Sequence, residues 1–412
     1  MLTVWYGRSI KAHIVKKIII VSEFILPEQN STGYFWHKII QKMAQSAITD
    51  HISVIAPADE QYIPDHFDKK VELNLFDSPT YNKNSLISRV WGQIKQTHAF
   101  YKKIKGNLES NTQVVSGTNP LFLMVLIALL KIFKPFKWCL LVHDVFPQNL
   151  VPAGILNKQS IFFKFLDMTF NLIYAQADQI IVIGRDMEMV LRQKKYKKDI
   201  TVIPNWVDFR EIELRDKNDS ELIKQLNWEN DIVFQFFGNI GRVQGIDHLI
   251  KAIQLVRHPQ AKFLFVGGGS AVELVKSYIE SDKKLNNVAY INELPSNKRS
   301  LGLSSCDIAI VTLADGMFGL GVPSKAYFSM AANRPILAIM DKNTEVACMV
   351  KEHQIGWVDS SNQPQLLAQL IDDICAQALL KNVVSSRIIL EKYYHQDVLL
   401  EKFVNILRLD NE

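Results

Sequence analysis

The stretch Val233–Ile253, VFQFFGNIGRVQGIDHLIKAI, decides the fold that we expect for this chain. It opens with a very apolar run, Val233–Phe237, which is typical of a strand that helices cover on both faces. A turn rich in glycine follows. The next apolar side chains recur at the i, i+3, i+4 and i+7 spacing of one helix face, and they are Ile246, Leu249, Ile250 and Ile253. Strand, turn and helix in this order predict a βαβ unit of a parallel sheet.

The same alternation of short apolar runs and helical patterns extends over the rest of the chain. After Gly33, the spacing of Trp36, Ile39, Ile40 and Met43 predicts a helix with one buried face. The further strand candidates are Ile18–Val21, Ile52–Ile55, Cys139–Val142, Ile180–Ile183, Phe263–Val266, Val288–Ile291, Ile308–Val311 and Ile336–Ile339. We therefore expect an α/β protein with two doubly wound, Rossmann-like sheets.

A chain of 412 residues is long for one hydrophobic core, so two domains are expected. The join is expected at Ile203–Asp208, where a strand pattern ends in Pro and Asn and a charge-rich stretch begins. The expected domains are residues 1–207 and 208–385, and residues 386–412 are expected to form a helix that packs back on the first domain. Ligands of such folds bind at the carboxyl ends of the strands, so we expect a cleft between the two domains.

The charge is unevenly distributed between the two halves. Residues 1–207 contain 25 Lys and Arg against 16 Asp and Glu, whereas residues 208–412 contain 22 against 26. The basic first half is expected to meet an anionic partner, either a lipid surface or a phosphorylated acceptor. Nucleic acid is not expected, because the sequence carries none of the basic and aromatic motifs of RNA-binding or DNA-binding modules.

The cysteines and the apolar runs indicate a cytoplasmic protein. The spacing of the cysteines matches neither a zinc site nor a redox pair, so buried free thiols are expected at Cys139, Cys306, Cys348 and Cys375. Met1–Lys17 lacks the apolar region of a secretory signal. The run Leu121–Leu130 is about half as long as a membrane span and is interpreted as a buried core helix.

The strongest local motif is Phe318–Lys325, FGLGVPSK, followed by a helical pattern. Glycines let backbone amides approach a ligand, proline suits a first helical turn, and a helix amino terminus favours negative charge. The candidate diphosphate-binding residues are Gly319, Gly321, Pro323 and Ser324, and Lys325 supplies a full positive charge beside them. The alternative is an ordinary helix cap with a solvated lysine.

A second motif, Phe237–Gly245, lies between the strand and the helix of the opening stretch. Phosphates bind at such turns in Rossmann-like sheets, so Gly241, Arg242 and Gln244 are candidate contacts of a bound phosphate. The spacing is not GxGxxG, and a purely structural turn is the alternative. Gly267–Gly269 stands at the end of another strand and is weak evidence by itself.

Two motifs of the first half complete the candidate site. Pro27–Gly33 links a strand to a helix, so Gly33 could hold a phosphate against helix amides; a polar loop with a Ser or Thr cap is the alternative. His143 and Asp144 follow a strand directly, and both could reach a bound sugar. A structural histidine is the alternative.

The basic and aromatic stretch Trp91–Lys105 suggests a further interaction. A helix of this composition could lie on an anionic membrane surface. A solvated helix of the first domain is the alternative.

In their order and spacing these motifs resemble those of the retaining, two-domain glycosyltransferases with the GT-B fold, often designated family 4. More narrowly, they resemble the branch found in bacterial O-antigen, capsule and colanic-acid clusters, whose members are described as fucosamine or fucose transferases. The resemblance covers nearly the whole chain from Lys17. It rests on Pro27-Glu28, Ser31-Thr32-Gly33, His143-Asp144 with Pro147, Ile203–Asp208, Gly238–Gly241 with Gln244-Gly245, Val322–Lys325 and Arg334-Pro335.

The resemblance implies a donor, an acceptor and a type of transfer. The second domain would hold most of a nucleotide-diphosphate sugar of the UDP or GDP type. The first domain would bind the acceptor, a lipid-linked saccharide precursor of a surface polysaccharide, and its basic surface would contact the cytoplasmic face of the inner membrane. Transfer would retain configuration and need neither a metal ion nor another cofactor.

This chain departs from the family at positions that carry its chemistry. The family usually has two glutamates around the motif Phe318–Lys325 and the helix after it. Here the corresponding residues are Leu320 and Phe328. The usual Arg and Lys of the preceding glycine turn correspond to Asn239 and Gln244. We therefore expect Lys325 to neutralise the phosphates in their place.

The ribose then needs another partner, and Glu345, in the loop after Ile336–Ile339, is the expected one. Together, the motifs and the resemblance assign catalysis to Lys325, His143, Asp144 and Arg242. They assign donor binding to Gly33, Asn205, Gly241, Gln244, Gly319, Gly321, Pro323, Ser324 and Glu345.

Two other classes of protein fit the same sequence. A sugar-nucleotide epimerase can share the architecture and would convert donor without an acceptor. A catalytically weak scaffold of a polysaccharide assembly complex would fit the two missing glutamates, and it would fail to bind a nucleotide diphosphate.

Overall fold

The protein is described here from a computed structural model. The structure describes residues 17–59, 67–77, 86–109, 111–194, 196, 198–281, 286–376 and 383–409. The expectation for Met1–Lys17 therefore falls almost entirely outside the described residues.

Internal contacts divide the chain into two compact units. The first comprises Met1–Leu141, Ala175–Ile181 and Leu400–Glu412, and the second comprises Val142–Tyr174 and Val182–Leu399. The division of the chain into domains at Val207 remains a prediction.

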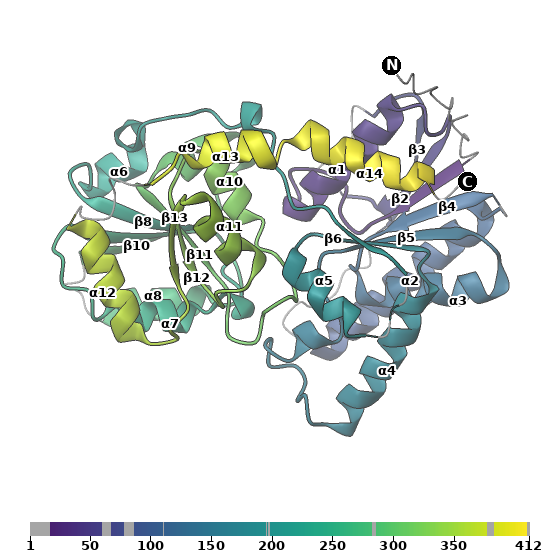
Figure 1. The fold of residues 1–412 in the computed structure, drawn as a ribbon, viewed down its shortest axis with the longest axis horizontal. Coiled ribbons are helices and arrows are strands. Elements are labelled where there is room, and N and C mark those ends of the chain that lie inside the picture. Colours follow the sequence, from purple (N-terminus) through teal and green to yellow (C-terminus); the bar gives the residue numbers. More distant parts are fainter. Residues whose placement is uncertain are drawn as a thin grey trace, which may run out of the picture. The chain divides into compact units, whose positions relative to one another are not determined.

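The first sheet has seven strands in the order β3-β2-β1-β4-β5-β6-β7 (Figure 1). The pairs β3–β2, β2–β1, β1–β4 and β4–β5 are parallel. The strand bounds are β1 Lys17–Val21, β2 Ile52–Pro57, β3 Val71–Phe76, β4 Thr112–Ser116, β5 Lys137–Val142, β6 Gln179–Val182 and β7 Ile200–Val202. The four strands predicted in the first half and the strand pattern that ends at Ile203, which is β7, are confirmed, whereas β3 and β4 were not predicted.

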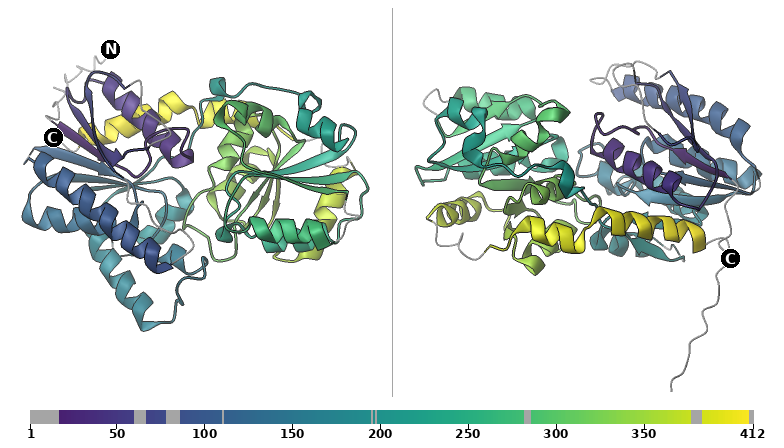
Figure 2. Two further views of the ribbon diagram at one scale, coloured as in Figure 1. Left: turned by 180° about the vertical axis from the view of Figure 1, so that it is seen from behind. Right: turned by 90° about the horizontal axis from the view of Figure 1, so that it is seen from above.

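Helices cover both faces of the first sheet. Right-handed crossovers place α2 (Leu86–Asn107) and α3 (Leu121–Phe133) on one face and α1 (Ser31–Gln45) on the other, since α2 and α3 lead toward β5 and α1 leads toward β3. The final helix, α14 (Gln396–Leu409), lies beside α1, with Lys42 Nζ 2.8 Å from Glu401 Oε2 (Figures 1 and 2). The predicted buried face of α1 is confirmed.

The second sheet has six parallel strands in the order β10-β9-β8-β11-β12-β13. The bounds are β8 Ile232–Phe237, β9 Ala261–Val266, β10 Val288–Ile291, β11 Ile308–Thr312, β12 Ile336–Ile339 and β13 Gly356–Asp359. The order turns back at β8 and β11, as in a doubly wound sheet. The prediction of two Rossmann-like α/β sheets is thus confirmed.

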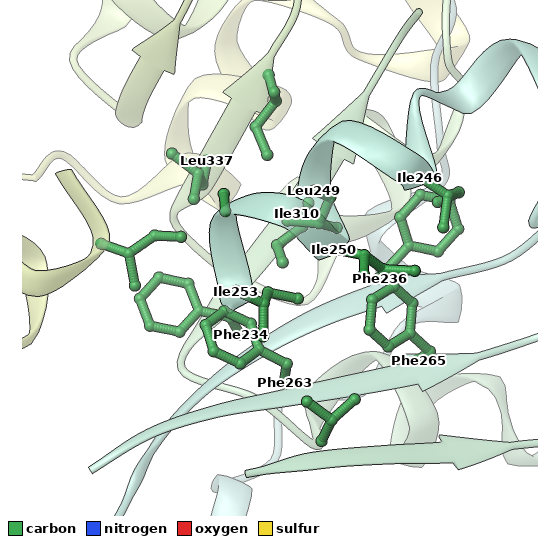
Figure 3. Packing of buried hydrophobic residues seen from close by; sticks show 14 of the residues in the cluster. Phe234, Phe236, Ile246, Leu249, Ile250, Ile253, Phe263, Phe265, Ile310 and Leu337 are labelled. Carbon is green, nitrogen blue, oxygen red and sulfur yellow. The ribbon is translucent and has the colours of Figure 1, made fainter. Parts of the chain in front are cut away.

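The main core of the second unit lies between this sheet and three helices, α7 (Ile246–Ile253), α8 (Val272–Ser281) and α12 (Pro364–Cys375). Figure 3 shows the apolar face of α7 against the rings of β8 and β9. Phe234 stacks on Phe263 and Phe236 stacks on Phe265, with centroids 5.5 and 6.2 Å apart. Full burial of each such ring contributes about 1.5–3 kcal/mol, so this layer fixes where the ends of β8 and β9 lie.

The remaining helices of the second unit are shorter or more peripheral. A smaller core cluster, which includes Ile223, Trp228 and Cys306, lies on the opposite face of the second sheet. The bounds are η1 Gln148–Leu150, α4 Ile161–Gln176, α5 Arg185–Arg192, η2 Phe209–Glu211, η3 Lys217–Asp219, α6 Glu221–Leu226, η4 Arg242–Gln244, η5 Ser296–Lys298, α9 Arg299–Ser304, α10 Lys325–Ala331, α11 Glu345–His353 and α13 Ser386–Tyr393.

Three expectations about the elements need correction. The helical pattern from Ser386 forms two helices, α13 and α14, because Tyr394 leaves the helical conformation and packs edge-on against Tyr327. The run Leu121–Leu130 buries only one face of α3, and Leu129 is 51% exposed. The cysteines are free and three are buried, but Cys348 is only partly buried. Among the described residues, no helix is both long and apolar enough to span a membrane.

Candidate active site

The turn after β8 has an unusual backbone that depends on glycine. Gly238 and Gly245 have φ angles of 114° and 62°, on either side of the short helix η4. The Ala314 N–H donates to the Val243 carbonyl at 2.9 Å, which fixes the turn against the end of β11. The second predicted motif is therefore a rigid turn at the carboxyl edge of the sheet.

The glycine run after β9 packs directly on this turn. A Cβ atom at Gly267 would lie 2.0 Å from the Gly238 carbonyl oxygen, and one at Gly269 would lie 2.4 Å from the Ile240 carbonyl oxygen. No larger residue fits at either position. The close approach of the two backbones therefore explains why glycine occupies Gly267 and Gly269.

Lys325, the first residue of α10, connects the motif Phe318–Lys325 to the turn Phe237–Gly245. Its Nζ lies 3.5 Å from the centroid of the Phe236 ring, donates to Gln244 Oε1 at 3.0 Å and lies 3.4 Å from the Asn239 carbonyl oxygen. Among the residues that the structure describes, no carboxylate pairs with this ammonium group. Lys325 and Gln244, which were predicted from separate motifs, are thus brought together.

Burial lowers the pKa of Lys325 to about 7. The aromatic ring and the two amide oxygens stabilise the charged form, but they replace its hydration incompletely. An anion bound nearby would raise this pKa again, because an opposite charge favours the charged form. The surroundings of Lys325 therefore favour the binding of an anion.

The turn Gly319–Gly321 packs against the segment after β5. Asp144 and Gly321 form an isolated antiparallel bridge, and the Val145 N–H donates to the Leu320 carbonyl at 3.0 Å. At Gly321 a Cβ atom would lie 3.3 Å from the His143 carbonyl oxygen. All these residues belong to the second unit. The structure thus places the predicted His143-Asp144 pair beside the predicted diphosphate turn.

His143 is partly buried at the carboxyl end of β5, where it was expected. Burial lowers its pKa to about 4. The imidazole is therefore neutral at physiological pH, so it can form hydrogen bonds with a sugar but cannot supply positive charge to a phosphate.

Glu345 is not in a loop, as expected, but is the first residue of α11, and its side chain is only 3% exposed. Its Oε2 accepts from the Arg185 backbone N–H at 2.7 Å and from Arg185 Nε at 3.0 Å. Arg185 also binds Glu352 through Nη1 at 2.8 Å. Oε1 of Glu345 has no partner among the described residues. One oxygen thus anchors the side chain to the start of α5.

Asp186 was missed in the sequence. It is 2% exposed, and its Oδ1 accepts from the Met187 N–H at 2.9 Å and its Oδ2 from the Gly319 N–H at 3.3 Å. Burial, together with the charge of Glu345, raises the pKa of Asp186 to about 6. Asp186 therefore holds the Gly319–Gly321 turn against the start of α5. The one signal in the sequence was the position of Gly184-Arg185-Asp186 directly after a predicted strand.

The other predicted site residues of the second unit lie at three different places. Arg242 is exposed in η4, beside the Gly241 turn. Pro323 precedes α10 and Ser324 is its N-cap residue, but the Ser324 side chain makes no capping hydrogen bond. Asn205 is buried in the segment between β7 and η2.

Gly33 lies in the first unit, in the first turn of α1. Its N–H donates to Asn30 Oδ1 at 2.9 Å, so Asn30 rather than Ser or Thr caps the helix. A Cβ atom at Gly33 would lie 2.1 Å from the Leu26 carbonyl oxygen. Close packing therefore requires glycine here, whatever its part in ligand binding.

Two Rossmann-like sheets with these turns at their carboxyl edges are the architecture of the GT-B fold. The family model "Glycosyl transferases group 1" matches residues 218–388. The chain is 43% identical to the probable glycosyltransferase WbjE of Pseudomonas aeruginosa over 393 residues, which cover 95% of this chain and 98% of that protein. The chain belongs to the group 1 glycosyltransferase family.

Solved structures agree on the fold. Sucrose-phosphate synthase from Thermosynechococcus elongatus matches with a TM-score of 0.72 and 16% identity, over 96% of this chain and 98% of that one. HepE of Anabaena, in complex with UDP and glucose, matches with a TM-score of 0.68 and 16% identity, over 95% and 99%. At these identities the likeness supports the GT-B fold alone.

Proposed function

We propose that this glycosyltransferase uses a UDP-type or GDP-type sugar and transfers the sugar, with retention of configuration, to a lipid-linked oligosaccharide precursor of a bacterial surface polysaccharide. The observation that carries the proposal is the Lys325 ammonium group, which lies between the Phe236 ring and the glycine turn without a described acidic partner. A diphosphate is the partner that such a group lacks.

The donor diphosphate would bind between the turns that Lys325 joins. Lys325 and Arg242 would neutralise its charge, and Gln244 with the backbone around Gly241, Gly319, Gly321, Pro323 and Ser324 would fix its position. HepE, which shares the fold, was solved with UDP and glucose, which supports a nucleotide diphosphate as the ligand class. Glu345 Oε1 would accept a hydrogen bond from the ribose, and Asn205 would complete the part of the donor site that the second unit supplies.

In the proposed reaction the acceptor hydroxyl attacks the anomeric carbon on the face from which the diphosphate departs. The bond from that carbon to the diphosphate oxygen breaks, and the departing phosphate oxygen takes the proton of the acceptor. Lys325 stabilises the developing negative charge, which is the largest electrostatic demand of the step. Neutral His143 and Asp144 would orient the sugar. Neither a metal ion nor a protein base is needed in this scheme.

If the acceptor is lipid-linked, the transfer reaction takes place at the cytoplasmic face of the inner membrane. The excess of Lys and Arg in residues 1–207 supports a peripheral contact with that surface. The resemblance of the motifs to transferases of O-antigen and capsule clusters supports the same class of acceptor.

A thermal-shift screen with UDP, GDP and dTDP sugars tests the proposal, because a bound donor raises the melting temperature by mass action. We expect a UDP-type or GDP-type donor to stabilise the protein, and a bacterial lipid-linked acceptor fraction to support its turnover. Conversion of donor without any acceptor would indicate an epimerase instead. No stabilisation by any nucleotide diphosphate would contradict the proposed function.

A further inference from the structure

The exposed face of α2 carries a tryptophan and three lysines. Among the side chains that the structure describes, Trp91, Lys95, Lys102 and Lys105 recur at the spacing of one helix face, and all are exposed. Trp91 is 60% exposed, and Ile94, at the edge of the same face, is 43% exposed. The sequence of α2 contains no Asp or Glu. The opposite face, with Phe100 and Ile104, is buried.

The neighbouring helix α3 ends in exposed apolar side chains. Leu129, Ile132 and Phe133 are 51%, 64% and 80% exposed, and they lie on the face opposite the buried one. The chain continues with two lysines, Lys134 and Lys137. Exposed large side chains of this kind form an apolar tip with a basic border.

The two helices form one surface, here named the α2–α3 surface. They cover the same face of the first sheet and pack against each other (Figures 1 and 2). Lys134 Nζ lies 3.4 Å from the Lys105 carbonyl oxygen, so the carboxyl ends of both helices meet. Because each helix buries the side that faces the sheet, both exposed faces point away from it. The apolar tip of α3 and the lysines of α2 therefore belong to one side of the first unit.

The positive charge of the α2–α3 surface favours an anionic bilayer over a second copy of the chain as its partner. No described carboxylate pairs with Lys95, Lys102, Lys105, Lys134 or Lys137. A second copy of the chain would bring two such basic surfaces together, and like charges oppose that contact. An anionic bilayer instead attracts the lysines and accepts the apolar tip below its headgroups.

We propose that the α2–α3 surface docks on a bilayer that contains anionic lipids, with Ile132 and Phe133 inserted among the headgroups. The proposal rests on the proposed function, since it names the surface that makes the membrane contact of a transferase with a lipid-linked acceptor.

Flotation with vesicles tests the proposal independently of catalysis. The wild type should bind vesicles of phosphatidylcholine and phosphatidylglycerol, and should bind pure phosphatidylcholine at least tenfold more weakly. The triple variant Lys95→Glu/Lys102→Glu/Lys105→Glu should lose binding at least tenfold. The matched control, Lys224→Glu/Lys251→Glu/Lys276→Glu, changes the same number of lysines in the second unit and should bind like the wild type.

The apolar tip has its own test. Ile132→Ser/Phe133→Ser should weaken vesicle binding severalfold without changing its dependence on salt, whereas Ile388→Ser/Val398→Ser, at residues 60% and 66% exposed, should have no effect. The stripe of exposed apolar residues on α4 provides the rival surface. Loss of binding in Phe162→Ser/Phe165→Ser, with full binding in both α2–α3 variants, would overturn the proposal.

The readouts separate this proposal from the proposed function. Each variant should keep the thermal shift produced by the donor, which verifies folding and the donor site together. Vesicle binding without any donor binding would leave the α2–α3 surface supported and contradict the function. Donor turnover by a protein that does not bind anionic vesicles would overturn the membrane surface alone.

Discussion

Lys325 is charged or neutral near physiological pH according to what it contacts. Its described partners are an aromatic ring and two amide oxygens, and burial brings its pKa down to about 7. A shift of one pKa unit corresponds to about 1.4 kcal/mol of difference between the two protonation states. Burial therefore disfavours the charged form of Lys325, and a bound diphosphate would offset this cost.

Replacement of this lysine tests its part in transfer. Lys325→Ala should lower the rate of sugar transfer by about a hundredfold or more, which is the order seen when one charge-stabilising donor is lost. Lys325→Arg keeps the charge and should retain more activity than the alanine variant. Steady-state rates at saturating donor measure the effect, and near-normal turnover by Lys325→Ala would remove the residue from the mechanism.

His143 predicts a pH dependence of stability. Its pKa falls from 6.5 to about 4 on folding, so between these values the unfolded chain binds more protons than the folded one. Its contribution to stability is complete above about pH 6.5 and is lost as the pH falls toward 4. Urea unfolding across this range should show a shallower loss of stability in His143→Asn than in the wild type. Equal slopes in the two proteins would contradict the burial of a neutral imidazole.

At the scale of elements, the site is built from turns at the carboxyl ends of strands. The turns after β8 and β9 pack backbone on backbone, and the side chain of Lys325 reaches from α10 to the first of them. The segment after β5 pairs with Gly321, and Asp186 holds Gly319. Because each turn is fixed by its neighbour, small changes of backbone at one turn should disturb the others.

Gly267 gives the sharpest test of this packing. With a φ of 141° and a Cβ position 2.0 Å from the Gly238 carbonyl oxygen, Gly267→Ala should destabilise the protein by at least about 2 kcal/mol. Gly106→Ala is the control, because no atom lies within 4 Å of its Cβ position in α2, and it should stabilise by about 0.5–1 kcal/mol. Urea denaturation measures both. Equal stability of the two variants would show that the turns do not pack as described.

Elements with strong apolar patterns could be predicted from the sequence, and elements with mixed patterns could not. Val233–Phe237 and the helix that follows were predicted because four of the five strand residues and the recurring inward positions of the helix are apolar. The strands β3, VELNLF, and β4, TQVVS, mix polar with apolar residues and lack the run of apolar residues that marks the predicted strands. Lateral pairing within the sheet, which the local sequence does not encode, makes them strands.

At the scale of the whole molecule, the order and spacing of the motifs predicted the family and the fold. They did not predict the contacts between the residues of the site. The hydrogen bond from the Arg185 N–H to Glu345 joins residues 160 positions apart, so no local sequence pattern predicts it. Asp186 was missed for the same reason, since a buried acid has no sequence signature without its partners. Lys325 and Gln244 were both proposed, but only the structure brings their side chains to 3.0 Å.

The central claim is that Lys325 becomes fully charged when a nucleotide diphosphate binds. Isothermal titration of UDP or GDP at pH 8, in buffers with different enthalpies of ionisation, measures the protons taken up on binding. A pKa that rises from about 7 predicts an uptake approaching one proton per site at pH 8, little uptake at pH 6, and none in Lys325→Arg. Binding at pH 8 without proton uptake in the wild type, or with the same uptake in Lys325→Arg, would contradict the account.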